Sequence, residues 1–139
     1  MVFVRYIAMD SESERIAFME EWLSGTGVDF TRANGVKVSD LDSVSEYFSA
    51  KRIARFGYDL TASEVGCFLA HRNCWMECST GAHPMLIMES DIRLGKGIDF
   101  HHLLGQLIEV SEKFDIVRLH GIFERNEFLR RRLVDLEGN

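Results

Sequence analysis

Short apolar runs alternate with helix-like segments along this chain, and this alternation constrains the fold more than any other feature. Four apolar runs are typical of strands: residues 2–9, 28–33, 85–88 and 114–119. Apolar side chains at three- and four-residue spacing predict helices over residues 13–25, 61–78 and 103–110. The resulting order, β-α-β-α-β-α-β, predicts an α/β fold with a mainly parallel sheet and helices on both faces.

Local signals place the ends of these helices. Thr61 and Glu64 have the spacing of a capping box, and Gly25 and Gly27 end the first helical pattern. Residues 40–50 are polar and weakly periodic, which indicates a short helix or an irregular surface insertion. At 139 residues the chain is long enough for one ordinary domain, so residues 1–139 are interpreted as a single domain.

Charge and composition exclude several classes of protein. Sixteen Lys and Arg against 22 Asp and Glu give a formal charge of -6, which repels nucleic acid and anionic lipid. No apolar run approaches the roughly 20 residues of a membrane span, and the first ten residues lack a secretory signal pattern. The three cysteines cannot all pair within the chain. These features predict a cytoplasmic protein with no nucleic-acid partner and no transmembrane segment.

Acidic residues follow the third predicted strand. Parallel sheets bind ligands beyond the carboxyl ends of their strands, where the turn of residues 8–15, the acids of residues 89–91 and the segment after Leu119 would gather. Glu89 and Asp91 lie two residues apart and could share Mg2+ or Mn2+ through carboxylate oxygens, an arrangement that suits a nucleotide diphosphate. The alternative is that both acids are solvated turn residues or a helix cap.

One helical stripe carries sulfur and nitrogen ligands. Cys67, His71, Cys74 and Cys78 are spaced four, three and four residues apart. The helix rises roughly 16 Å over this span, so one zinc ion cannot bind all four, and adjacent pairs would need ligands from elsewhere. We therefore expect the cysteines to pack in the core rather than to bind zinc. His71 is either a hydrogen-bonded core residue or a donor near a diphosphate.

Two groups of basic residues are weaker candidates. Arg15 and the turn from Asp10 to Ser13 could contact a base, ribose or phosphate, although no glycine-rich phosphate loop is present. Arginines also cluster near the end of the chain and alternate with acids: Arg125, Arg130, Arg131 and Arg132. This cluster is interpreted as a solvated helix face, with phosphate binding as the alternative.

Several segments together resemble a known family. They are residues 60–71 (LTASEVGCFLAH), Trp75, residues 86–92 (LIMESDI) and residues 114–119 (FDIVRL), together with Asp10 and Glu14-Arg15 near the start. This set resembles glycosyltransferase family 25, which includes lipooligosaccharide galactosyltransferases of Gram-negative bacteria. The resemblance spans most of the chain.

The resemblance implies a Rossmann-like, GT-A-type nucleotide-sugar fold. It also implies an enzyme that transfers a hexose, expected to be galactose, from a UDP-sugar donor to a lipooligosaccharide acceptor. Carried over to this chain, Glu89 and Asp91 would hold Mn2+ or Mg2+, and Asp10 and Arg15 would contact the donor. Ser90 stands where the family more often has a central acid. The resemblance assigns no catalytic residue, and it places the enzyme in the cytoplasm, peripheral at the inner membrane.

Family members continue beyond the strand that residues 114–119 resemble. We therefore expect this chain to be the amino-terminal, donor-binding half of such an enzyme, and its unpaired sheet edge to favour a homo-oligomer. Two alternatives stay open. One is a non-catalytic nucleotide-binding or assembly domain, and the other is a phosphohydrolase of flavodoxin-like topology with Asp10 as the nucleophile.

Overall fold

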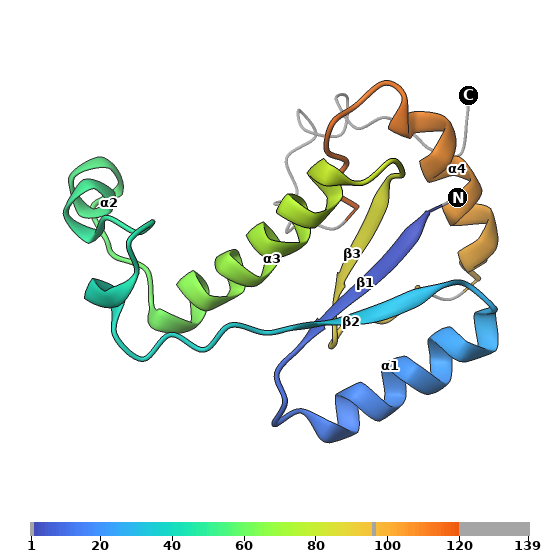
Figure 1. The fold of residues 1–139 in the computed structure, drawn as a ribbon, viewed down its shortest axis with the longest axis horizontal. Helices are drawn as coiled ribbons and strands as arrows, with labels where there is room; N and C mark the ends of the chain where they lie inside the picture. The colour runs from blue at the N-terminus through green and yellow to red at the C-terminus, as the bar shows by residue number, and fades with distance from the viewer. Residues whose placement is uncertain (1, 96, 120–139) are drawn as a thin grey trace. The chain divides into compact units, whose positions relative to one another are not determined.

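The computed structural model describes residues 2–95 and 97–119 of the chain, which form two compact units divided near residue 96. The first unit contains a parallel sheet of three strands, β1 (Phe3–Ala8), β2 (Phe30–Asn34) and β3 (Met85–Glu89), in the order β2-β1-β3 (Figure 1). In register, Val4 of the central strand lies between Phe30 and Leu86. The predicted α/β class and parallel sheet are confirmed, and each predicted strand of this unit agrees within two residues.

Helices α1 (Ser13–Thr26) and α3 (Ala62–Thr80) contact successive residues of the central strand. The Tyr6 hydroxyl donates a 3.0 Å hydrogen bond to Glu20 of α1, and burial together with Glu20 raises the pKa of Tyr6 to about 12. Ile7, the next residue, packs with Ala70 and Cys74 of α3. The central strand therefore contributes to the packing of both helices.

The ends of these helices follow the predicted signals. The capping box of α3 is present: Thr61 Oγ1 accepts from the Glu64 amide at 3.2 Å, and the Glu64 carboxylate accepts from the Thr61 amide at 2.8 Å. Helix α1 ends at Gly27, whose φ of 68° lies in the left-handed region that glycine adopts without strain.

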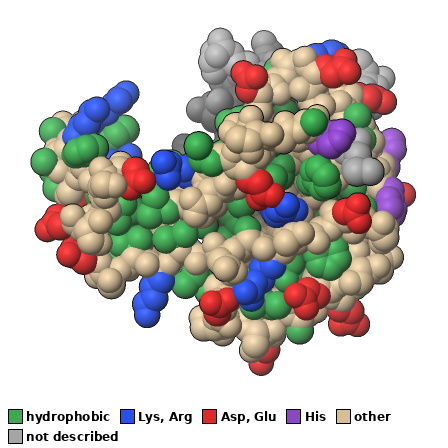
Figure 2. Space-filling model, in the orientation of Figure 1, with side chains coloured by type: hydrophobic (Ala, Val, Ile, Leu, Met, Phe, Trp, Pro, Cys, Tyr) green, Lys and Arg blue, Asp and Glu red, His purple; other side chains and the backbone are tan. Residues whose placement is uncertain are grey.

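The segment between β2 and α3 forms a short 3-10 turn, η1 (Leu41–Ser43), and helix α2 (Ser49–Phe56). The prediction of a surface insertion over residues 40–50 is confirmed, but helix α2 extends past this range to Phe56. Apolar side chains of α2 and of the residues next to it are exposed, as Figure 2 shows at the left of the molecule: Phe48, Ile53, Phe56 and Tyr58. The Arg52 guanidinium stacks over the Phe56 ring at 4.0 Å, which covers part of that ring.

The second unit, as far as it is described, contains helix α4 (Phe100–Ser111). The Asp99 carboxylate caps it by accepting hydrogen bonds from the amides of His101 and His102, which hold the pKa of Asp99 below its ordinary value. The predicted strand over residues 114–119 is wrong, because these residues have no strand structure and Ile116 is 74% exposed. An apolar run becomes a strand only when a neighbouring strand pairs with its backbone, and none of the described strands does so here.

Candidate functional site

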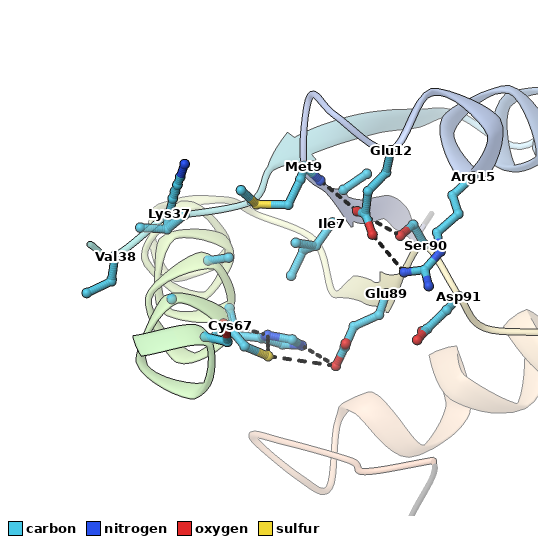
Figure 3. A pocket seen from close by; sticks show the side chains of 17 residues that line it. Ile7, Met9, Glu12, Arg15, Lys37, Val38, Cys67, Glu89, Ser90 and Asp91 are labelled. Atoms are coloured by element: carbon cyan, nitrogen blue, oxygen red, sulfur yellow. Dashed lines mark hydrogen bonds and ion pairs between the residues drawn. The ribbon is translucent and has the colours of Figure 1, made fainter. Parts of the chain in front are cut away.

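A cavity of about 360 Å³ lies at the carboxyl ends of the strands in the first unit (Figure 3). Its walls are the turn after β1, the segment after β2, the first half of α3 and the end of β3. In the order β2-β1-β3 the chain passes to one side of β1 and then to the other, so the strand order reverses between β1 and β3. Parallel α/β sheets bind their ligands at such a reversal.

Glu12 links the turn after β1 to the end of β3. Its Oε2 accepts a 2.8 Å hydrogen bond from the Met9 amide and a 3.3 Å hydrogen bond from Ser90 Oγ, and its Oε1 accepts from Arg15 Nη1 at 2.7 Å (Figure 3). Sequence reasoning missed Glu12. The available signal was its position three residues before Arg15, the spacing of an ion pair on a helix.

Three of the four predicted site residues line this one cavity: Arg15, Glu89 and Asp91. All three are exposed, so their charges are accessible to a ligand. Asp10 is not among the lining residues. Its carboxylate is 84% exposed and pairs with Arg32 at 2.7 Å. This pairing lends no support to Asp10 as the nucleophile of a phosphohydrolase.

Ser90, between the two acids, points in a different direction from them. It is 3% exposed, its amide donates to the Ile7 carbonyl at 3.0 Å, and its hydroxyl faces Glu12. An acid at this position would bring a second carboxylate against that of Glu12. The local geometry therefore gives a physical reason for an uncharged residue between Glu89 and Asp91.

The cysteine stripe of α3 is divided between the core and the cavity. Cys74 is 2% exposed and packs with Ile7 and Ala70, so the core prediction is confirmed for it. For Cys67 the prediction is wrong, because this part of α3 lies beside the end of β3 and Cys67 is exposed on the cavity wall. Cys78 is partly buried.

The Cys67 thiol faces the acids that end β3. Partial burial raises its pKa, and the negative charges of Glu89 and Asp91 raise it further. The thiol donates to Glu89 Oε1 at 3.9 Å. Cys67 is therefore held in its protonated form at neutral pH, which does not suit a nucleophile.

Comparison with known families places this cavity in context. The sequence profile of glycosyltransferase family 25 (LPS biosynthesis protein) matches residues 2–135. The chain belongs to this family. Searches of curated proteins and of solved structures gave no match. The matched range includes every residue that lines the cavity, so the predicted family is confirmed for the part of the chain that forms the site.

A close backbone approach fixes one wall of the cavity in this family 25 chain. Gly66 of α3 is buried, and a Cβ atom there would lie within 3.0 Å of the Val36 carbonyl oxygen, nearer than real Cβ atoms come. Only glycine lets α3 pack this closely on the segment after β2. This packing sets the position of Cys67 and His71, and no sequence pattern predicted it.

Two remaining sequence predictions concern the rest of the family 25 chain. The arginine cluster at residues 125–132 lies outside the described residues. Among the helices that the structure describes, none has the length and apolar composition of a membrane span.

Proposed function

We propose that this family 25 chain binds a UDP-sugar in the cavity and transfers its hexose, galactose by our expectation, to a lipooligosaccharide acceptor. The observation that carries the proposal is the position of Glu89 and Asp91, exposed together on a cavity at the strand-order reversal. The family supports glycosyl transfer in LPS biosynthesis. The donor, the sugar and the acceptor are parts of the proposal.

The residues present fit a hard divalent ion. Glu89 and Asp91 offer carboxylate oxygens, which Mg2+ and Mn2+ prefer, and neither makes an ion pair with Lys or Arg among the described residues. Both side chains are exposed, so the ion could keep water molecules and bind phosphate oxygens as well. Such an ion would act as a Lewis acid that stabilises the charge on the departing diphosphate.

The chain's own residues would orient the donor. Arg15 lies on the cavity with its guanidinium held by Glu12, and a guanidinium binds phosphate oxygens through paired N–H groups. Lys37, on the segment after β2, adds a second cation to the lining. Asp10 lies in the turn before α1, the helix that carries Arg15, and its contact with the nucleotide stays a prediction from the sequence.

We also propose that the first unit is a GT-A-type, Rossmann-like half with helices on both faces of its sheet. The alternate contacts of Tyr6 with α1 and of Ile7 with α3 support this arrangement. A cytoplasmic location, peripheral at the inner membrane, belongs to the same proposal, because LPS biosynthesis is the process that the family description names.

One observation favours a second candidate function, a non-catalytic nucleotide-binding or assembly domain. Among the described strands, none pairs with the outer edge of β3, and α2 exposes several apolar side chains. Unpaired edges and apolar patches favour association with another chain.

Release of nucleoside diphosphate tests the transfer directly. The chain is incubated with Mn2+, lipooligosaccharide and a panel of UDP-hexoses, and free UDP is measured with and without the acceptor. We expect acceptor-dependent release with one hexose, and its loss in Asp91→Asn. The control is Glu14→Gln, an exposed acid of α1 that does not line the cavity. Metal-dependent UDP binding without any release would favour the non-catalytic alternative.

A further inference from the structure

Three side chains with sulfur, nitrogen and oxygen ligands meet on one wall of the cavity. Cys67 and His71 lie one turn apart on α3, and Glu89 ends β3. One ligand atom from each lies within 4.8 Å of the other two. Figure 3 shows the Cys67 thiol directed at the Glu89 carboxylate. This cluster shares Glu89 with the pair of Glu89 and Asp91 considered above, and its other two members come from α3.

Two of the separations between these ligand atoms are close to those of a tetrahedral zinc site. Zinc lies about 2.3 Å from sulfur and about 2.0–2.2 Å from nitrogen or oxygen, which places neighbouring ligand atoms roughly 3.4–3.6 Å apart. Here Cys67 Sγ and His71 Nε2 each lie 3.9 Å from Glu89 Oε1. Side-chain movements of about 0.3–0.5 Å would bring both pairs to these separations.

The imidazole is already oriented as a metal ligand. His71 Nδ1 lies 3.0 Å from the Cys67 carbonyl oxygen, and since a carbonyl can only accept, Nδ1 carries the proton. In the neutral ring, Nε2 then presents its lone pair toward Glu89. Histidines that bind metals commonly donate their other ring N–H to a backbone carbonyl in this way.

A cation would relieve an unfavourable contact in this cluster. The neutral Nε2 and the Glu89 carboxylate are both acceptors, and they face each other at 3.9 Å. Such a pair is stabilised by a metal ion between the two atoms. That ion would also recruit the neighbouring Cys67 thiol.

We propose that Cys67, His71 and Glu89 form a site for a borderline-soft divalent ion, with Zn2+ as the preferred occupant and its fourth position open to the cavity. Sulfur and imidazole ligands select zinc over Mg2+, whose preferred ligands are oxygens. Binding converts the Cys67 thiol to a thiolate and releases its proton to solvent.

The zinc site does not rest on the proposed glycosyl transfer. If both hold, the two ions share Glu89, so zinc would compete with the hard ion and inhibit Mn2+-dependent donor binding. Sites with three protein ligands and an open position suit exchangeable or reactive ions rather than purely structural ones.

Cobalt titration of the metal-free chain tests the site, because a thiolate bound to Co2+ gives a charge-transfer absorption that Zn2+ abolishes on displacement. We expect one equivalent of Co2+ to produce this absorption in the original chain. Cys67→Ser should lose it, and Glu89→Gln should weaken cobalt binding about tenfold or more. Cys78→Ser, a change outside the cavity lining, is the control and should retain it. Circular dichroism checks that each variant is folded.

Asp91→Asn separates this proposal from the proposed function. It removes a ligand of the hard ion but none of the zinc site, so cobalt absorption should persist while Mn2+-dependent UDP binding falls. Absence of thiolate-cobalt absorption in the original chain, or its persistence in Cys67→Ser, would overturn the zinc site whatever the outcome with UDP. Failure of UDP binding with cobalt absorption intact would instead refute the proposed function alone.

Discussion

Replacing Gly66 by alanine should destabilise the first unit although alanine is the better helix former. A Cβ atom at Gly66 would lie nearer to the Val36 carbonyl oxygen than real Cβ atoms come, so α3 must shift away from the segment after β2. The obstacle is backbone, which cannot rotate away as a side chain can. Overpacking of this kind costs about 1–3 kcal/mol, against a gain of about 1 kcal/mol for removing a helical glycine.

We therefore expect Gly66→Ala to lower the free energy of unfolding by up to about 2 kcal/mol net in urea titrations followed by circular dichroism. Gly25→Ala is the matched control, because Gly25 lies in α1 and its Cβ would meet no atom within 4 Å. That variant should be unchanged or more stable by up to about 1 kcal/mol. Equal stability of the two variants would refute the argument that α3 depends on close contact at Gly66.

Three further predictions concern the cavity and the sheet edge. Because the pKa of Cys67 is raised, its thiol should react with iodoacetamide at neutral pH more slowly than free cysteine does. Asp91→Asn removes a negative charge near the thiol and should accelerate the reaction. An unchanged rate in Asp91→Asn, followed by peptide mass spectrometry, would count against the charge effect. Ser90→Asp should lower the unfolding free energy at pH 7 by about 1–3 kcal/mol, because it sets a second carboxylate against that of Glu12. At pH 5 the loss should be smaller, because protonation of one of the two acids relieves the repulsion. Equal losses in urea titrations at both pH values would contradict this. Since no described strand pairs with the outer edge of β3, sedimentation at micromolar concentration should show a dimer or larger species, and a clean monomer would refute the association.

Local signals in the sequence were sufficient for the strands of the first unit and for its helices α1 and α3. The capping box at Thr61 and the left-handed glycine at Gly27 act through neighbouring residues, so their positions could be predicted. The run at residues 114–119 shows the limit of this approach. Its composition is that of a buried strand, but pairing depends on a partner strand that composition cannot supply.

The site was predictable where it depends on strand ends. Glu89 and Asp91 follow an apolar run, and parallel topology brings such residues to one edge together with Arg15. The role of Cys67 was not predictable, because helical spacing shows which residues share a face of α3 but not where the sheet beneath it ends. Glu12 was missed for a related reason, since its partner Ser90 is 78 residues away in sequence.

Calorimetric titration with UDP tests the central claim, that Glu89 and Asp91 hold a divalent ion for a nucleotide diphosphate. We expect UDP to bind in the presence of Mn2+ and to lose at least about tenfold in affinity with chelator, in Glu89→Gln and in Asp91→Asn, while Glu14→Gln binds as the original chain does. Equal affinity with chelator, or in both cavity variants, would contradict the claim.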